Sequence, residues 1–389
     1  MSKQPRNTVW PASEHTLAKI AILRAYLQAW FTILGTTVPK DMLYIDGFAG
    51  PGRYADGEDG SPIVAVKAAN DARVAANRPW KAKTIRMIFV ERDEARFDIL
   101  QSQIAACPQR PDVKVQCIND EFASAFSNIK REHRDAFTSS MPLFAFLDPF
   151  GVKGIPFQIL KEILSSGTSE AFLLLDTDGM ERIRSAGSNA GYEKVLDEVF
   201  GGSKWRDISF TDDAKLNSRK ILLAYRRQLR SAAGAEFTFP FEMRKSNGTV
   251  SHHLLFATKH IRGLEKMKEA MRSVEKTFVF MDGQSNQPFL FDPDDPAVIR
   301  RDVEEYFQQQ CSGRERSYDD IKSWVLQETH YTHADKILNK MRDRHGIESI
   351  VIGGKVVTSL PSHIQWADAD RIKFRDRLAP PVTGLFGQE

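Results

Sequence analysis

The residues best suited to chemistry in this chain are a carboxylate and several glycines that follow a short apolar run. Residues 42–45 form that run, Asp46 ends it, and the chain passes directly into a glycine-rich turn. Gly47, Gly50 and Gly52 allow positive φ angles and let a ligand approach the backbone closely. The segment therefore predicts a strand followed by a ligand-binding loop.

The spacing of this loop discriminates between ligands. A dinucleotide loop has G-x-G-x-x-G and an acid about 20 residues later, but the next strand-end acid here, Glu91, lies much further on. A phosphate-binding P-loop needs Gly-Lys-Ser/Thr, which does not follow here. Asp46, Gly50 and Gly52 instead match D-x-x-x-G-x-G, the S-adenosylmethionine loop of class I methyltransferases, and Phe48 resembles the form found in amino-methyltransferases of DNA and RNA. The candidate cofactor residues in this loop are Asp46, Gly47, Phe48, Ala49, Gly50 and Gly52.

Four successive predicted strands end on a carboxylate. These residues are Asp46, Glu91, Asp120 and Asp148. Each alone has a structural alternative as a cap, a turn or a surface ion pair, but open α/β sheets bind ligands beyond the carboxyl ends of their strands. In class I methyltransferases the second acid commonly holds the ribose, which would be Glu91, and the third position contacts adenine, which would be Asp120 or Asn119. The set predicts one cofactor crevice.

The fourth strand end, Asp148-Pro149-Phe150, contains the candidate catalytic residues. It resembles the D-P-P-F/Y motif of enzymes that methylate exocyclic amines, where oxygens accept the amine hydrogens and the ring stacks on the base. This chain has one proline where the motif has two, so Phe150 is displaced by one position and the target base stays open. No Pro-Cys pair occupies this strand end, which disfavours a cytosine C5 enzyme.

The elements that must position these residues follow from hydrophobic periodicity. Expected helices lie at 14–34, with Ser13 as the cap, and at 61–76, 93–106, 214–230 and 263–277. Expected strands lie at 42–45, 85–90, 113–118, 143–147 and 171–175, with an antiparallel pair at 236–244 and 252–260 around Asn-Gly. The alternation predicts an α/β, Rossmann-like class I methyltransferase fold, whose sheet is mostly parallel with an antiparallel end strand.

The domain organisation follows from composition. Residues 1–280 are expected to form the methyltransferase-like domain, and 281–296, rich in Gln, Asn, Asp and Pro, a linker. Three short helical candidates, at about 297–310, 317–328 and 332–344, and a hairpin of 349–352 and 355–358 have the order of a winged helix, a second, small domain at 297–360. The tail, 361–389, has little periodicity and is expected to be extended or loosely packed.

Bulk composition limits the function classes. With 42% apolar and 27% charged residues, no uncharged apolar run of about 18 and no signal-peptide core, the chain reads as cytoplasmic and not membrane-bound. Three cysteines are too few for a disulfide framework or a cysteine-rich zinc site. A net charge of +3 permits nucleic-acid binding without requiring it. His252 and His253 read as strand residues rather than metal ligands. The arginines at 182, 184, 226, 227 and 230 could contact phosphates, but a solvated helix face is the preferred interpretation.

The amino-acid sequences of four segments resemble those of one bacterial family, the three-Cys-motif partner (TcmP) proteins. The segments are I-D-G-F-A-G-P-G-R-Y (45–54), G-S-P-I-V-A-V (60–66), F-L-D-P-F-G (146–151) and the stretch at 253–268. The resemblance covers about 13–277, and the region after the linker is similar to the winged helix often appended to that family. It implies a partner protein with three clustered cysteines, of radical-SAM type, encoded nearby and often on phage-related or mobile elements.

Two function hypotheses follow. The first is an S-adenosylmethionine-dependent methyltransferase that acts on an exocyclic amine of a DNA or RNA base, together with the three-Cys-motif partner. The alternative is a catalytically silent Rossmann-like module that docks a partner protein or DNA, which the single proline at position 149 favours.

Overall fold

The computed structural model describes residues 8–138, 140–153, 155–186, 190–244, 250–275, 311–328, 332–343 and 345–376. The chain divides into two compact units, Met1–Gly283 and Gln284–Glu389, each of which is treated by itself.

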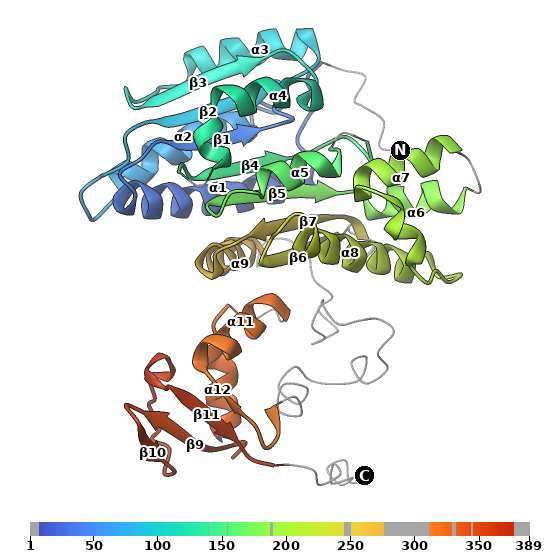
Figure 1. Ribbon diagram of the computed structural model, residues 1–389. Helices are drawn as coiled ribbons and strands as arrows, with labels where there is room; N and C mark the ends of the chain where they lie inside the picture. Colours follow the sequence, from blue (N-terminus) through green and yellow to red (C-terminus); the bar gives the residue numbers. More distant parts are fainter. Residues whose placement is uncertain are drawn as a thin grey trace, which may run out of the picture. The chain divides into compact units, whose positions relative to one another are not determined.

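The N-terminal unit is built on a seven-stranded sheet of order β3-β2-β1-β4-β5-β7-β6 (Figure 1). The strands are β1 (Met42–Asp46), β2 (Ile85–Val90), β3 (Val113–Ile118), β4 (Leu143–Leu147), β5 (Ser169–Leu175), β6 (Phe237–Arg244) and β7 (Val250–Thr258). The first five are parallel, and β7 is inserted antiparallel between β5 and β6. The predicted mostly parallel sheet with an antiparallel end is therefore confirmed, and its order reverses between β1 and β4, the switch point where such sheets bind ligands.

Helices cover both faces of this sheet. They are α1 (Glu14–Thr37), α2 (Ser61–Val74), α3 (Glu94–Ala106), α4 (Phe122–Glu132), α5 (Phe157–Ile163), α6 (Thr177–Ser185), α7 (Ala190–Phe200), α8 (Ala214–Ser231) and α9 (Ile261–Glu275). Leu43 and Ile45 of β1 face the core that α4, α5 and α8 complete, whereas Tyr44 between them points to the other face and stacks on Phe144 at 6.0 Å. Burial on both faces explains why β1 and β4 are continuous apolar runs.

Helix α1 begins where the sequence predicts and extends three residues further. The Ser13 side chain accepts a hydrogen bond from the Thr16 amide, which satisfies one of the free N–H groups of the first turn. By length and composition α1 is apolar enough to cross a membrane, but half of its most apolar stretch is buried. Tyr26 packs against both Phe144 and Phe256 of the sheet, so α1 serves as a covering helix of this unit.

The C-terminal unit contains α11 (Tyr318–Glu328), α12 (Ala334–Asp343) and an antiparallel sheet of order β10-β9-β11-β8. The hairpin of β9 (Ile347–Ile352) and β10 (Lys355–Val357) follows the two helices at the predicted place. The expected linker and the helix at 297–310 lie outside the described residues, so the winged-helix assignment stays a prediction.

The prediction that the tail is extended or loosely packed is wrong for residues 366–374. Strand β11 (Arg371–Phe374) pairs with β9 and with β8 (Glu315–Arg316), and a 3-10 turn, η3 (Trp366–Asp368), precedes it. Trp366 and Phe374 are 1% and 0% exposed, so this segment completes the core of the unit. A strand of four residues is too short to show a period in the sequence, which is why the pattern gave no signal.

Candidate functional site

The loop after β1 is tied by hydrogen bonds to the carboxyl end of the neighbouring strand. The Ala49 amide donates to the Val90 carbonyl oxygen at 2.9 Å, and the Gly50 amide donates to Glu91 Oε2 at 2.9 Å. The predicted glycine loop and the predicted second strand-end acid therefore lie together at one edge of the sheet.

The glycines of this loop have different roles. Gly50 and Gly52 have φ angles of 63° and 85°, in the left-handed region that favours glycine. A Cβ on Gly50 would meet no heavy atom within 4 Å, so open space lies against the backbone there. At Gly47 a Cβ would lie 2.9 Å from the Leu147 side chain, so the absent side chain allows close packing instead.

Asp46 is fully buried at the end of β1. Its Oδ1 accepts a hydrogen bond from the Phe48 amide at 3.2 Å, while Oδ2 is buried without a hydrogen-bond partner among the described residues. Burial raises the pKa of Asp46 to about 7, because the charged form is poorly solvated there, against the lowering effect of the nearby Ser61 side chain and the Phe48 amide. A buried acceptor without a partner is suited to receive a donor from a ligand.

The second and third strand-end positions are arranged around Glu91. Its carboxylate is buried, and Oε1 accepts a hydrogen bond from the Asp93 amide at 2.8 Å. Asn119 and Asp120 are both exposed. The Asn119 side-chain amide donates to the Glu91 carbonyl oxygen at 2.9 Å, whereas the Asp120 carboxylate accepts from the adjacent Glu121 amide at 2.7 Å. Of the two adenine candidates, Asn119 is thus the one tied to Glu91.

At the fourth strand end, Asp148 forms an ion pair with Lys19 of α1. The side chains of Lys19 and Asp148 are only 10% and 21% exposed, so water screens this pair weakly. The two residues are 129 positions apart in the sequence. A local pattern could not have revealed the pair, although Lys19 lies between apolar residues of the first helix, among the residues that turn out to be buried.

Phe150 belongs to a group of aromatic side chains near this strand end. Its ring is 42% exposed and meets the Trp10 ring edge to face at 6.0 Å. Trp10 also contacts the Tyr54 ring, at 6.2 Å, and the Arg96 guanidinium lies 4.8 Å from its ring centroid. Trp10 and Tyr54 were not among the predicted site residues. They bring the N-terminal segment and the glycine loop beside Phe150.

A pocket of about 530 Å³ opens next to Phe150, at the carboxyl ends of β4 and β5. Its lining includes Phe150, Lys153, Asp176, Arg182 and Tyr192. Asp176 is nearly buried: Oδ1 caps α6 by accepting from the Gly179 amide at 2.8 Å, and Oδ2 has no hydrogen-bond partner within the described ranges. Lys153 and Arg182 are exposed, and neither forms an ion pair within the described residues. The pocket therefore combines an exposed ring with two unpaired cations.

The other arginines expected on a solvated helix face divide into two kinds. Arg184 forms two hydrogen bonds of 2.6 Å with Glu181. Arg226 is buried and donates to the Thr238 carbonyl oxygen at 3.0 Å, so the expectation of a solvated side chain is wrong there. Its guanidinium satisfies backbone acceptors inside the fold, which periodicity alone does not show.

His252 and His253 lie in β7, as expected of strand residues. His253 Nδ1 and Thr177 Oγ1 are hydrogen-bonded at 2.9 Å. Burial lowers the pKa of His252, against the opposing charges of Asp176 and Asp148. Among the residues that the structure describes, no group of three or more His, Cys, Asp or Glu side chains could hold a metal ion.

The chain is similar to several solved structures at low sequence identity. No protein-family model and no curated protein matches the chain, so the resemblance to TcmP proteins stays a prediction. Among solved structures, an O-methyltransferase from Bacillus cereus in complex with SAH is 16% identical, over 61% of this chain and 80% of that one, with a TM-score of 0.32. Trm1 from Pyrococcus horikoshii with S-adenosyl-L-methionine is 9% identical, over 95% and 97%, with a TM-score of 0.38.

A third similar structure is the METTL16 MTase domain, 12% identical over 60% of this chain and 66% of that one, with a TM-score of 0.28. Values this low carry no conclusion about activity. The fold assignment rests on the strand order and on the antiparallel β7 between β5 and β6.

Proposed function

We propose that this protein is an S-adenosylmethionine-dependent methyltransferase that acts on an exocyclic amine of a nucleic-acid base. The observation that carries the proposal is the hydrogen bond between the loop after β1 and the end of β2, where Gly50, at positive φ and beside open space, donates its amide hydrogen to Glu91. This loop follows β1, one of the two strands at the sheet's switch point. Asp46 and Asp148 end the strands on either side of that switch point.

The residues present fit this cofactor. The open space at Gly50 lets a ligand lie against the loop formed by Asp46, Gly47, Phe48, Ala49, Gly50 and Gly52. The free Oδ2 of Asp46 suits a cationic or N–H donor group, and the Glu91 carboxylate suits paired hydroxyls. Asn119 or Asp120 would contact the adenine. When bound, the cofactor supplies an electrophilic methyl group.

The acceptor half of the site would be built from Asp148, Pro149 and Phe150. The exposed Phe150 ring can stack on an extruded base, while carboxylate and main-chain oxygens accept the amine hydrogens. Lys153 and Arg182 in the adjoining pocket would contact backbone phosphates. Catalysis would consist mainly of holding the amine in line with the methyl group, an effect worth at most about 7 to 11 kcal/mol.

The proposal extends to partners. We propose that a three-Cys-motif protein of radical-SAM type works with this chain, and that the C-terminal unit is a winged helix that engages nucleic acid or that partner. The support is the motif wording of residues 45–54 and 146–151 and the order of α11, α12 and the β9–β10 hairpin.

The alternative, a catalytically silent binding module, is favoured by one observation. Asp148 is already paired with Lys19, and a carboxylate engaged in this way is less available to an amine. A double-mutant cycle decides how strongly Asp148 is held: Lys19→Met, Asp148→Asn and their combination. We expect a coupling energy of about 1–3 kcal/mol in urea denaturation, because the pair is largely withdrawn from water.

The test of turnover is methyl transfer from labelled S-adenosylmethionine to mixed DNA, RNA and a three-Cys-motif partner protein. We expect label in a nucleic-acid fraction with the wild type and none with Asp148→Ala, while Asp207→Ala, at an exposed aspartate, retains the activity. Label on the partner protein alone would refute the nucleic-acid acceptor. Cofactor binding without any transfer would favour the silent module.

A further inference from the structure

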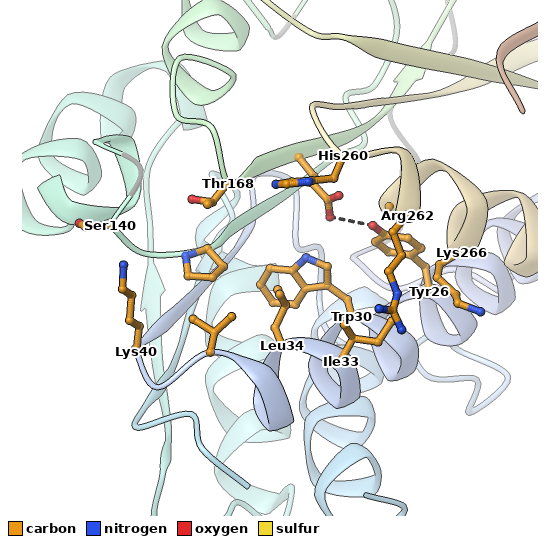
Figure 2. A pocket seen from close by; sticks show the side chains of 14 residues that line it. Tyr26, Trp30, Ile33, Leu34, Lys40, Ser140, Thr168, His260, Arg262 and Lys266 are labelled. Atoms are coloured by element: carbon orange, nitrogen blue, oxygen red, sulfur yellow. Dashed lines mark hydrogen bonds between the residues drawn. The ribbon is translucent and has the colours of Figure 1, made fainter. Parts of the chain in front are cut away.

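A second pocket opens at the amino-terminal ends of the parallel strands, between α1 and α9 (Figure 2). Three of its lining residues fix this location: Lys40 precedes β1, Pro142 precedes β4, and Thr168 precedes β5. These are the amino-terminal ends of parallel strands, whereas the candidate methyltransferase site lies beyond their carboxyl ends. The pocket has a volume of about 330 Å³, within the range typical of small-molecule sites, about 300–1,000 Å³.

The body of this pocket is apolar. Trp30, Ile33 and Leu34 line it from one face of α1, and Pro142 adds a further apolar residue to the lining. Figure 2 shows the Trp30 indole in the middle of the lining, with Ile33 and Leu34 close by. An aromatic or aliphatic group entering here would exchange water for carbon surface, a gain of roughly 25 cal/mol per Å² of apolar area.

The carboxylate in the pocket wall, Glu170, is already satisfied. Its Oε2 accepts a hydrogen bond from the Tyr26 hydroxyl at 2.7 Å, drawn as the dashed line in Figure 2, and its Oε1 accepts from the Thr258 hydroxyl at 2.8 Å. Gly263 allows this packing, because a Cβ there would lie 2.2 Å from Oε1. Glu170 thus belongs to the structure of the wall and offers little to a ligand.

The rim of the pocket is positively charged. Lys40 stands at one side, and His260 and Arg262 stand at the other (Figure 2). Lys266 is paired with Glu269 at 2.7 Å, but Lys40 and Arg262 are exposed and form no ion pair within the described part of the chain. Two basic side chains that form no ion pair with any described residue thus border a cavity whose own carboxylate is satisfied.

We propose that this pocket binds a small amphipathic carboxylate, whose apolar body lies against Trp30 and whose charge faces Arg262. The planar guanidinium matches a carboxylate in two parallel hydrogen bonds, and Lys40 adds a favourable potential at the rim. This ligand is distinct from the proposed methyl donor in place and in chemistry. The inference does not depend on methyl transfer.

The test is calorimetric titration of the full chain with 2-naphthoate, using the neutral 2-naphthamide as the matched ligand. We expect the carboxylate to bind and the amide to bind about tenfold more weakly, since a charge-assisted hydrogen bond contributes on the order of 1.4 kcal/mol. Arg262→Gln is expected to weaken the binding of 2-naphthoate by a similar factor. Arg78→Gln, at an exposed arginine outside the lining, leaves the affinity unchanged.

A second variant separates this pocket from the cofactor site. Ile33→Trp fills the cavity with a larger side chain and is expected to abolish naphthoate binding, while circular dichroism and retained S-adenosylhomocysteine binding report that the unit is folded. The proposal is overturned if naphthoate does not bind, if neither variant changes its affinity, or if saturating S-adenosylhomocysteine displaces it. If the wild-type protein does not bind S-adenosylhomocysteine at all, that result would instead count against the proposed function alone.

Discussion

At the scale of single residues, the protonation state of Asp46 couples the stability of the protein to pH. Burial raises its pKa from 3.8 to about 7, whereas in the unfolded chain the carboxyl group is solvated. Between pH 4 and 7 the folded state therefore binds more protons than the unfolded state. Stability from this group is fully present below about pH 4 and is lost as the pH rises through about 7.

Asp46→Asn should remove this dependence, because the amide carries no charge at any pH in the range. A shift of about three pKa units corresponds to at most about 4 kcal/mol, so we expect the variant to gain up to that amount over the wild type at pH 8 and little at pH 4. Urea denaturation at both pH values measures the difference. Asp207→Asn, at an exposed position, should follow the wild type. A constant difference between Asp46→Asn and the wild type would contradict the assignment.

At the scale of elements, alanine substitutions in and near the glycine loop should distinguish the stability cost of backbone strain from the loss of a ligand contact. Gly50 and Gly57 both have positive φ, 63° and 87°, and a Cβ at either meets nothing within 4 Å. Alanine at each position should therefore cost about 1–2 kcal/mol of stability through the backbone alone. Only Gly50 lies beside Glu91, so only Gly50→Ala should also weaken S-adenosylhomocysteine binding, as calorimetry would measure. Equal affinities of the two variants would refute a cofactor at this loop.

The elements around that loop were largely predictable from the sequence, for a physical reason. Strands β1 and β4 are buried on both faces and β2 nearly so, so they appear as short, mostly apolar runs, and their ends place the acids. Helix α6 was missed because Asp176-Thr177-Asp178 reads as a strand end, although Asp176 also caps the helix that follows at once. One short segment served both elements.

Contacts between distant segments could not be predicted in this way. The pairing of Lys19 with Asp148 and the packing of Trp10 on Phe150 join residues more than 120 positions apart, and no local period encodes them. The candidate site was therefore predictable as a set of strand ends, while the side chains that α1 and the N-terminal segment add to it were not.

At the scale of the whole molecule, α1 runs from the carboxyl-terminal ends of the parallel strands to their amino-terminal ends. Lys19 meets Asp148 at the carboxyl edge, and Trp30 lines the pocket at the amino edge; eleven residues of helix separate them by about 16 Å. One rigid element thus contributes to both proposed ligand sites, although the two sites open at opposite ends of the strands.

Each unit also has buried core residues of its own, and a matched pair of leucines should show that the two units are stabilised separately. Leu229 of α8 and Leu338 of α12 are both 0% exposed, and each belongs to the core of its own unit. Leucine to alanine at either position should cost about 2–5 kcal/mol. Hydrogen exchange measured on peptides should become faster across residues 311–376 in Leu338→Ala, while exchange in strands β1 to β5 stays unchanged. In Leu229→Ala, exchange should become faster in strands β1 to β5 and stay unchanged across residues 311–376. If either substitution accelerated exchange equally in both units, the two cores would have to unfold as one.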